Sequence, residues 1–302
     1  MSTTLSSPIV CTGVGLHSGA AVKLTLMPEL EGDRGRYFVR TDLQNSAMIP
    51  AQVSLVGETV LSTELVAAAG AEQGTVRTVE HLLAALVSYG VEAVRIEVDG
   101  PELPLLDGSA QGWSQAIATA GVTHDAAQTS ERSPTSNATP SYPALEQPQW
   151  IHDGDAFVAA LPSPVLRFSY GIEFQEAPIG KQWHSWTPAD FGRDGDDFLN
   201  AIGKARTFGL ARQIDQLRQA GLIKGGSLEN ALVCDEERWL NPPLRFENEP
   251  VRHKILDLVG DLSLIGTIPT AHYVAFKASH RLHVALAKAI AQPLPSPVPP
   301  QS

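Results

Sequence analysis

A polar, proline-containing segment near the middle of the chain limits what the chain can fold into. Residues 124–148 read HDAAQTSERSPTSNATPSYPALEQP. They are rich in Ser, Thr, Pro and Ala and show no apolar periodicity, which is typical of a flexible connector. We therefore expect a first domain over residues 1–123 and a second domain over residues 149–290, each with its own core. The final residues, 291–302, form a tail with too much proline to continue a helix.

Both flanking segments mix helical and strand patterns. TVRTVEHLLAALVSYG has apolar residues at helical spacing with Thr78 as a possible N-cap, and VEAVRIEVDG then alternates as a strand does. The glycines of GVGLHSG precede the alternating AVKLTLMP, which favours a tight turn into a strand over a phosphate loop. A second helix is expected to begin between Asp107 and Ser109. No internal repeat is evident in the sequence. The mixed helical and strand patterns on both sides of the connector predict two α+β units.

Composition and charge exclude several function classes. The 302 residues are 43% apolar and 18% charged, and the formal net charge is −11. This balance argues against nonspecific nucleic-acid binding and against a polybasic membrane-binding patch. Neither an export signal nor a run of 18 apolar residues is evident, so we expect a cytoplasmic protein without a transmembrane segment. Cys11 and Cys234 lack metal-site spacing, so any metal would be held by histidines and carboxylates.

The stretch VRHKILDLVGDLSL places polar residues in an apolar, helical pattern. His253 and Asp257 are four residues apart and so lie one turn apart on the same face of a helix, with Asp261 a further turn along. A histidine and a carboxylate at this spacing can share a metal ion, and a carboxylate behind them can orient a ligand or a catalytic group. The alternative is a helix whose polar face is solvated.

Two other positions favour the metal site. Glu80 and His81 lie in the first turn of a helix that is otherwise apolar, and His280 follows the predicted strand in HYVAFKASH. A catalytic zinc ion needs three protein ligands and an open position, and His81, His253 and Asp257 form such a set. Glu80 would then act as a general base and His280 as a proton donor. Spacing alone leaves three competing histidines, His17, His272 and His283.

Seven motifs in one order carry a resemblance to a known family. They are GVGLHSG, TVEHLLAAL, PELPLLDGSA, ARTFGL, GLIKGGSLENALV, LRFENEPVRHKILDLVGDL and FKASH. The chain resembles the UDP-3-O-acyl-N-acetylglucosamine deacetylase family, zinc amidases that commit precursors to lipid A synthesis, over about residues 8 to 290 apart from the connector. The resemblance implies an α+β fold of two similar domains. Each is a sheet layered with helices, and the helices pack face to face with the active site at the junction.

The resemblance also implies a role for each matching residue. The resemblance implies that His81, His253 and Asp257 bind zinc. Its catalytic residues would be Glu80 as general base, His280 as general acid, Asp261 as the carboxylate that supports His280, and Thr207 as the hydroxyl near the developing oxyanion. Its substrate-binding residues would be Lys254, Lys277 and Phe208. Ser279 stands where the family usually has glycine, directly before His280.

The implied reaction is hydrolysis of the acetamide of UDP-3-O-acyl-N-acetylglucosamine, a small lipidated UDP-sugar. The protein would need no nucleic acid and no transmembrane segment, and transient contact with a membrane surface is compatible with such a substrate. Alternatives are a zinc deacetylase for another N-acetyl amino sugar and a catalytically idle sugar-nucleotide or lipid-binding protein of the same fold. A His₂Asp set also accepts Fe²⁺. An insertion in the second domain would form an acyl-chain passage, although core packing explains its apolar residues equally well; these are Leu210, Ile214, Leu217 and Leu222.

Overall fold

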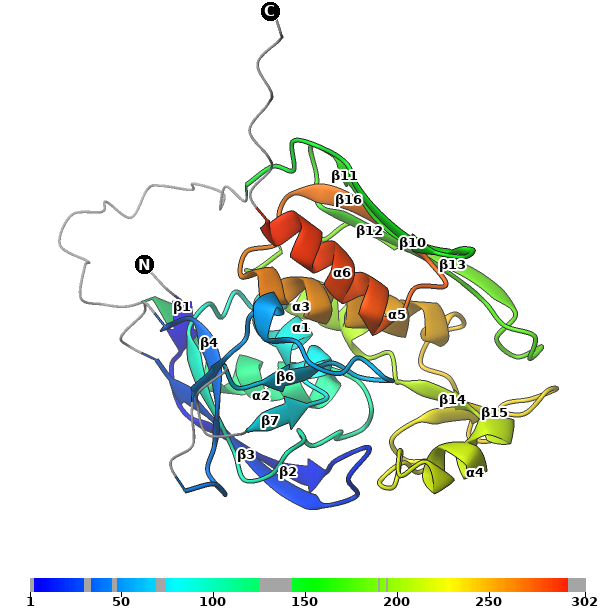
Figure 1. Cartoon of the computed structure of the whole chain (residues 1–302), viewed down its shortest axis with the longest axis horizontal. Helices are drawn as coiled ribbons and strands as arrows, with labels where there is room; N and C mark the ends of the chain where they lie inside the picture. Colours follow the sequence, from blue (N-terminus) through cyan, green and yellow to red (C-terminus); the bar gives the residue numbers. More distant parts are fainter. Residues whose placement is uncertain are drawn as a thin grey trace, which may run out of the picture.

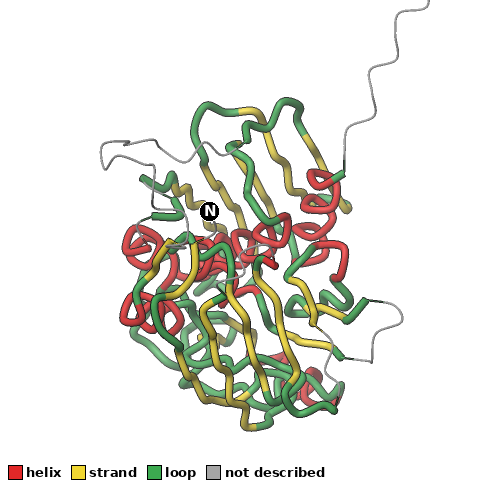
Figure 2. The backbone as a smooth tube through the Cα atoms, turned by 90° about the vertical axis from the view of Figure 1, so that its left-hand side faces the viewer, coloured by secondary structure: helices red, strands yellow, loops and turns green. Residues whose placement is uncertain are grey.

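Two five-stranded sheets enclose a layer of helices. The computed structural model of the chain describes residues 3–29, 34–44, 48–68, 74–124, 143–189, 191–193 and 195–292. In Figure 1 one sheet lies above the helices and the other below them. The perpendicular view in Figure 2 shows the same three layers, with strands outside and helices between. The expected α+β architecture, with helices facing one another between the sheets, is confirmed.

The first sheet has the strand order β2-β3-β8-β4-β5. Its strands are β2 (Ile9–Val14), β3 (Ala21–Pro28), β4 (Arg36–Arg40), β5 (Met48–Pro50) and β8 (Val94–Val98). Neighbours are antiparallel except β4 and β8, which are parallel. A parallel pair needs a crossover, and α1 (Glu80–Ser88) lies in this connection, while α2 (Gln111–Ala120) follows β8. The alternation of apolar residues in β3 and β8 gives each strand one buried face.

The second sheet repeats this topology in the order β10-β11-β16-β12-β13. Its strands are β10 (Gln149–Asp153), β11 (Ala156–Pro162), β12 (Arg167–Glu173), β13 (Lys181–Trp186) and β16 (Ala271–Phe276). Again one pair, β12 and β16, is parallel. The helix α5 (Glu249–Leu262) lies in its crossover, and α6 (His280–Ala291) follows β16. The chain therefore contains a structural repeat in which α5 corresponds to α1 and α6 to α2.

Smaller elements extend each half. In the first half β1 (Thr3–Leu5) pairs with β9 (Val122–His124), and β6 (Glu64–Val66) pairs with β7 (Thr75–Arg77). In the second half β14 (Phe208–Leu210), α4 (Ala211–Gln219) and β15 (Leu232–Cys234) form a separate unit with two parallel strands. Short helical turns complete the description; these are Val53–Leu55, α3 (Gly195–Phe198), Leu199–Gly203 and Ser263–Ile265.

The two crossover helices, α1 and α5, pack directly against each other. Their backbones approach closely at Gly260, where a Cβ atom would lie 2.2 Å from the backbone oxygen of Glu80. Only glycine fits so near another backbone, and interiors packed at this density do not yield by that much. The close approach brings the first turn of α1, which carries Glu80 and His81, beside the buried face of α5.

Hydrogen bonds from the first sheet to the end of α5 reinforce this arrangement. The buried Arg36 on β4 donates from Nη2 to the carbonyl oxygens of Ser263, at 2.7 Å, and Gly266, at 3.1 Å. These carbonyls follow the C-terminus of α5, where the helix dipole favours a cation. One side chain of the first sheet therefore fixes the end of the helix from the second half.

Several local expectations differ from the structure. The N-cap of the first helix, which begins at Glu80, is Val79 and not Thr78, because Thr78 has a φ of 60° and its hydroxyl donates to Glu102 at 2.9 Å. The second begins at Gln111, because Ser109 accepts the Gln111 N–H at 3.1 Å from outside the helix. The helix α6 continues to Ala291, so the proline-rich tail begins one residue later than expected, and residues 293–302 lie outside the described residues.

The connector lies mostly outside the described residues, which omit 125–142. At its described end, the N–H of Leu145 donates to the carbonyl of Thr270 at 3.1 Å, so this end is attached to the second half. The strand β10 begins at Gln149. The division at residues 124–148 stays a prediction. Among the described helices none is both long and apolar enough to cross a membrane.

The contact at Gly260 yields a prediction about stability. Replacing glycine by alanine inside a helix usually stabilises it by about 1 kcal/mol. Here the added methyl group would collide with the backbone of α1, so Gly260→Ala should instead lower the free energy of unfolding by about 1–3 kcal/mol. Urea denaturation measures this difference. Gly100→Ala is the control, because its Cβ would meet Val22 at an ordinary 3.5 Å; equal stabilities for the two variants would contradict the packing described.

Candidate metal centre and active site

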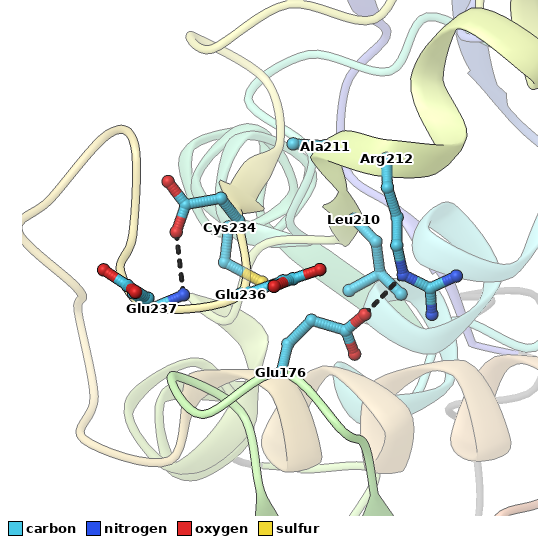
Figure 3. Close-up of a pocket in the computed structure, with 8 residues that line it drawn as sticks. Glu176, Leu210, Ala211, Arg212, Cys234, Glu236 and Glu237 are labelled. Carbon is cyan, nitrogen blue, oxygen red and sulfur yellow. Dashed lines mark hydrogen bonds and ion pairs between the residues drawn. The ribbon is translucent and has the colours of Figure 1, made fainter.

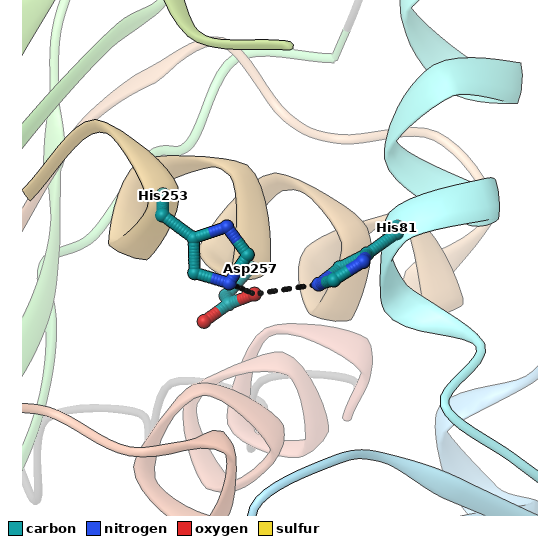
Figure 4. Close-up of side chains that lie close together, drawn as sticks. All are labelled: His81, His253 and Asp257. Atoms are coloured by element: carbon teal, nitrogen blue, oxygen red, sulfur yellow. Dashed lines mark ion pairs between the residues drawn. The ribbon is translucent and has the colours of Figure 1, made fainter. Parts of the chain in front are cut away.

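Three side chains from α1 and α5 converge on one point. The Nε2 atoms of His81 and His253 lie 3.6 Å and 3.3 Å from Oδ1 of Asp257. Figure 4 shows the His81 ring reaching from α1 towards the carboxylate, with His253 one turn from Asp257 on α5. One ligand atom of each residue lies within 4.8 Å of the others. The structure thus brings together the three residues expected to bind metal.

The protonation of this group suits a metal ion. His253 donates from Nδ1 to the carbonyl of Ala205 at 3.0 Å, which leaves the Nε2 lone pair directed at the cluster. Burial lowers the pKa of His253 to about 4, so its ring is neutral at physiological pH. Burial raises the pKa of Asp257, but His253, Lys254 and His280 outweigh burial and hold it well below its usual value. The buried Oδ1 of Asp257 has no hydrogen-bond partner. A divalent cation satisfies this set.

Glu80 lies beside His81 in the first turn of α1 and is 2% exposed. Its Oε2 accepts a hydrogen bond from the backbone N–H of Thr63 at 3.0 Å, which fixes one carboxylate oxygen. Burial raises the pKa of Glu80 above its ordinary value, with smaller opposing contributions from His280 and His81. A raised pKa suits a carboxylate that exchanges a proton near neutral pH.

His280 forms an ion pair with Asp261. Its Nδ1 donates to Oδ2 of Asp261 at 2.8 Å, and its Nε2 lies 3.8 Å from Oδ2 of Asp257. Burial by itself lowers the pKa of His280, but Asp261, Asp257 and Glu80 together raise it to about 9. The ring is therefore cationic at neutral pH, with its Nε2–H on the side of the metal ligands.

Sequence reasoning missed or left open two residues that hold Asp261. Thr63, in the loop before β6, donates from its hydroxyl to Oδ1 of Asp261 at 2.6 Å. His283, one of the competing histidines, donates from Nδ1 to Oδ2 at 2.8 Å. No local pattern marks Thr63, whereas the three-residue spacing of His280 and His283 on one helix was a usable signal. His253, Asp257 and Asp261 on α5 are buried, so the alternative of a solvated polar face is wrong.

Thr207 and Phe208 lie beside the metal-binding group. The segment containing them follows Ala205, whose carbonyl accepts the hydrogen bond from His253. Thr207 is held by its backbone, because its N–H donates to Gly108 at 2.7 Å and its carbonyl accepts from Leu232 at 2.8 Å. The Phe208 ring meets the His253 ring edge-on at a centroid distance of 6.5 Å.

The two expected substrate-binding lysines occupy different environments. Lys254 donates to Oδ2 of Asp257 at 2.8 Å and so contacts a predicted metal ligand directly. Lys277 directly follows β16, and its ammonium group forms ion pairs with Asp155 at 2.7 Å and with Glu173 at 3.2 Å. Ser279 has φ −121° and ψ 170°, an extended backbone that serine adopts without strain.

The other competing histidines belong to neither described group that could hold a metal ion. His17 is in the turn before β3, where its Nδ1 accepts the N–H of Ile223 at 3.4 Å. The Nε2 of His272, on β16, bonds with Ser169 Oγ at 2.9 Å.

A separate pocket lies beside β14 and β15 (Figure 3). Its lining is rich in carboxylates and contains no histidine, unlike the metal-binding group; the residues are Glu176, Leu210, Ala211, Arg212, Cys234, Asp235, Glu236 and Glu237. In Figure 3 the Arg212 guanidinium meets Glu176, with Nε 2.7 Å from Oε1.

Two imidazoles, one carboxylate, an adjacent buried glutamate and a cationic histidine define the class of protein: this is the residue set of a metal-dependent hydrolase. The family model described as UDP-3-O-acyl N-acetylglycosamine deacetylase matches residues 2–292. The chain therefore belongs to the UDP-3-O-acyl N-acetylglycosamine deacetylase family.

Individual relatives agree with this assignment. Proteins named UDP-3-O-acyl-N-acetylglucosamine deacetylase from Nostoc sp. and Synechocystis sp. are each 55% identical to this chain, over 287 and 291 residues. The alignments cover 95% and 96% of this chain and 97% and 99% of those proteins. A protein of Arabidopsis thaliana named probable UDP-3-O-acyl-N-acetylglucosamine deacetylase 1, mitochondrial, is 40% identical over 299 residues, which cover 94% of this chain and 86% of that protein.

The ligand geometry yields a prediction about metal content. Replacing His81 or Asp257 by alanine should remove most of the bound metal, because a three-ligand site tolerates the loss of one ligand poorly. Elemental analysis of purified variants measures this directly. His272→Ala is the matched control, since His272 bonds with Ser169 outside the cluster and should keep the metal. Full metal content in both ligand variants would show that the metal is held elsewhere.

Proposed function

We propose that this protein hydrolyses the acetamide of UDP-3-O-acyl-N-acetylglucosamine to acetate and UDP-3-O-acyl-glucosamine, the committed step of lipid A biosynthesis. The observation that carries the proposal is the buried cluster of His81, His253 and Asp257, flanked by Glu80 and His280, in a member of this family. The names of relatives that match nearly the full length of the chain support the substrate.

Zinc is the proposed cofactor, held by His81, His253 and Asp257. Such an ion supplies Lewis-acid chemistry, since it polarises the groups bound to it and lowers the pKa of water. Two imidazoles and a carboxylate suit Zn²⁺, and they also suit Fe²⁺.

Glu80 is the proposed general base. It lies next to a ligand in sequence, and the N–H of Thr63 holds one of its oxygens. Its burial and raised pKa favour uptake of a proton from the attacking water.

His280 is the proposed general acid. The bond from Nδ1 to Asp261 orients the ring and leaves the Nε2–H for the departing amine. A pKa of about 9 keeps this ring protonated at neutral pH. Glu80 would thus accept a proton and His280 would donate one, so the two groups have complementary roles.

Thr207 is proposed to donate its hydroxyl to the oxyanion, because its backbone is fixed on both sides near His253. Lys254, Lys277 and Phe208 are the proposed substrate-binding residues. For Lys277 the proposal implies that its pairs with Asp155 and Glu173 give way to an anionic part of the nucleotide, which partly exposed ion pairs permit at low cost.

The unit made of β14, α4 and β15 is proposed to hold the acyl chain. This unit contacts the first half of the protein through a hydrogen bond from the N–H of Gly225 to the carbonyl of Leu16, at 2.9 Å. Ile214, Leu217 and Leu222 are half-buried apolar residues of this unit. Leu210 is 6% exposed, so core packing explains it as well.

A catalytically idle binding protein of this fold has no use for a complete set of ligands, base and acid, so enzyme activity is favoured. We also propose a cytoplasmic location, where free thiols such as Cys11 and Cys234 stay reduced.

The direct test is an acetate-release assay on UDP-3-O-acyl-N-acetylglucosamine with metal-loaded protein. The same sugar nucleotide without its acyl chain is the matched control substrate. We expect acetate from the acylated compound, and much slower release from the control if the acyl chain contributes binding energy in the transition state. Equal turnover of both compounds would identify an enzyme for another N-acetyl amino sugar, and no turnover of either would contradict the proposal.

Removing either proton-handling group should separate catalysis from metal binding. Glu80→Gln and His280→Ala should each lower kcat by about 10²- to 10⁴-fold, because general acid–base catalysis contributes that much. Neither residue belongs to the ligand set, so both variants should keep the metal. Elemental analysis and steady-state kinetics on the same preparations test this. Loss of metal from His280→Ala would make His280 a ligand and would overturn the assignment.

The pair of Asp261 and His280 predicts a change in the pH–rate profile. The negative charge of Asp261 helps to raise the pKa of His280, so that loss of its proton contributes to the alkaline limb. Asp261→Asn removes that charge, lowers the pKa of His280 and should move the alkaline limb to lower pH. The measurement is kcat against pH for both proteins. An alkaline limb that stays in place while activity falls would show that the two residues are not coupled.

A further inference from the structure

The carboxylate of Asp261 is held by more than the histidine it is proposed to support. Asp261 is 0% exposed and accepts hydrogen bonds from three side chains. Thr63 binds Oδ1 at 2.6 Å, while His280 and His283 both bind Oδ2 through Nδ1 at 2.8 Å. One oxygen atom therefore joins two imidazoles from successive turns of α6.

The second nitrogen of His283 is also engaged. Its Nε2 lies 2.9 Å from the hydroxyl oxygen of Tyr170 on β12, and the two rings meet edge-on at 90°. The Tyr170 hydroxyl donates to the carbonyl of Ala278 at 2.7 Å, two residues before His280. Tyr170 thus contacts both His283 and the backbone that leads into α6. His283 is 0% exposed, so no water replaces these contacts.

A buried carboxylate depends on such donors. Each buried lone pair left without a partner costs free energy of folding. A carboxylate with fewer hydrogen-bond donors also rotates more easily about its Cβ–Cγ bond. Burial raises the pKa of Asp261, but bonds and charges from His280 and His283 hold it at about 2. Loss of the His283 donor would leave Oδ2 bound to His280 alone.

We infer that His283, held in place by Tyr170, is a positioning residue for the proton donor His280, because it fixes the Asp261 oxygen to which His280 binds. The inference rests on the proposed function, in which His280 protonates the leaving amine. His283 has no described contact with a metal ligand. Its ring lies 5.9 Å from the His280 ring, centroid to centroid, and its hydrogen bond to Asp261 is the directional contact that fixes the oxygen to which His280 binds.

Two polar variants of His283 separate its two nitrogens. In His283→Asn the side-chain amide can donate from the place of Nδ1, whereas in His283→Gln it reaches the place of Nε2 and leaves Asp261 without that donor. We expect His283→Gln to lower kcat by about 10- to 100-fold. Losses of this size are usual for residues that orient a functional group by a hydrogen bond without contacting the reacting atoms. KM and metal content should stay near those of the parent. His283→Asn should recover most of that loss.

A spectroscopic readout tests the positioning separately from turnover. In protein labelled with ¹⁵N-histidine, the Nδ1 proton of His280 bonded to Asp261 should give a low-field resonance in the parent and in His283→Asn. In His283→Gln that resonance should broaden or disappear through exchange with water. Tyr170→Phe, which removes only the hydroxyl, should shift the His283 resonances and weaken that of His280. His272→Leu is the control, because His272 does not contact Asp261, and it should change neither the His280 resonance nor kcat.

The outcomes distinguish the inference from the proposed function. If His283→Gln keeps the His280 resonance, or if Asn and Gln variants behave alike in both measurements, the inference is wrong and His283 only fills space. If the parent protein releases no acetate but its resonances respond as described, the proposed function fails while the positioning of His280 by His283 stands.

Discussion

The contact between α1 and α5 is the constraint on which the rest of the structure depends. Gly260 allows α5 to lie against the backbone of Glu80, so that His81 from one half of the chain reaches His253 and Asp257 from the other. A bulkier residue would force the helices apart and separate ligands that must converge within the reach of one ion. Close packing at Gly260 therefore helps to bring the metal-binding residues of the two halves together.

The repeated topology explains why the site lies where it does. Each half has the same strand order and one parallel pair, and the crossover of each pair includes one of the two packed helices, α1 or α5. Packing the halves with their helices inward brings these corresponding helices together between the sheets (Figures 1 and 2). The two helices differ in what they contribute. The first supplies Glu80 and one ligand, and the second supplies two ligands and Asp261, so the repeat in the fold is not a repeat in chemistry.

Sequence reasoning predicted the parts of the site that depend on local spacing or on motif resemblance. The one-turn spacing of His253 and Asp257 placed them on one helical face, the residue pattern offered His81 as a third ligand, and the resemblance implied the same set. Thr63 was missed because it lies 198 residues from Asp261 and only tertiary structure joins them. The predicted N-cap of α1 was wrong because Thr78 adopts a left-handed conformation and donates a hydrogen bond to Glu102. Residue patterns did not show the repeat, because it preserves topology without preserving residues, and only the resemblance implied two similar domains.

The central claim is that His81, His253 and Asp257 hold the catalytic metal. Anomalous diffraction from a crystal of metal-loaded protein, recorded on both sides of the absorption edge of the metal, tests it most directly. We expect one strong anomalous peak, from an ion bonded to Nε2 of His81, Nε2 of His253 and the carboxylate of Asp257. A peak instead among Asp261, His280 and His283, the other described group able to hold an ion, would contradict the account, because the proposed proton donor would then be a ligand.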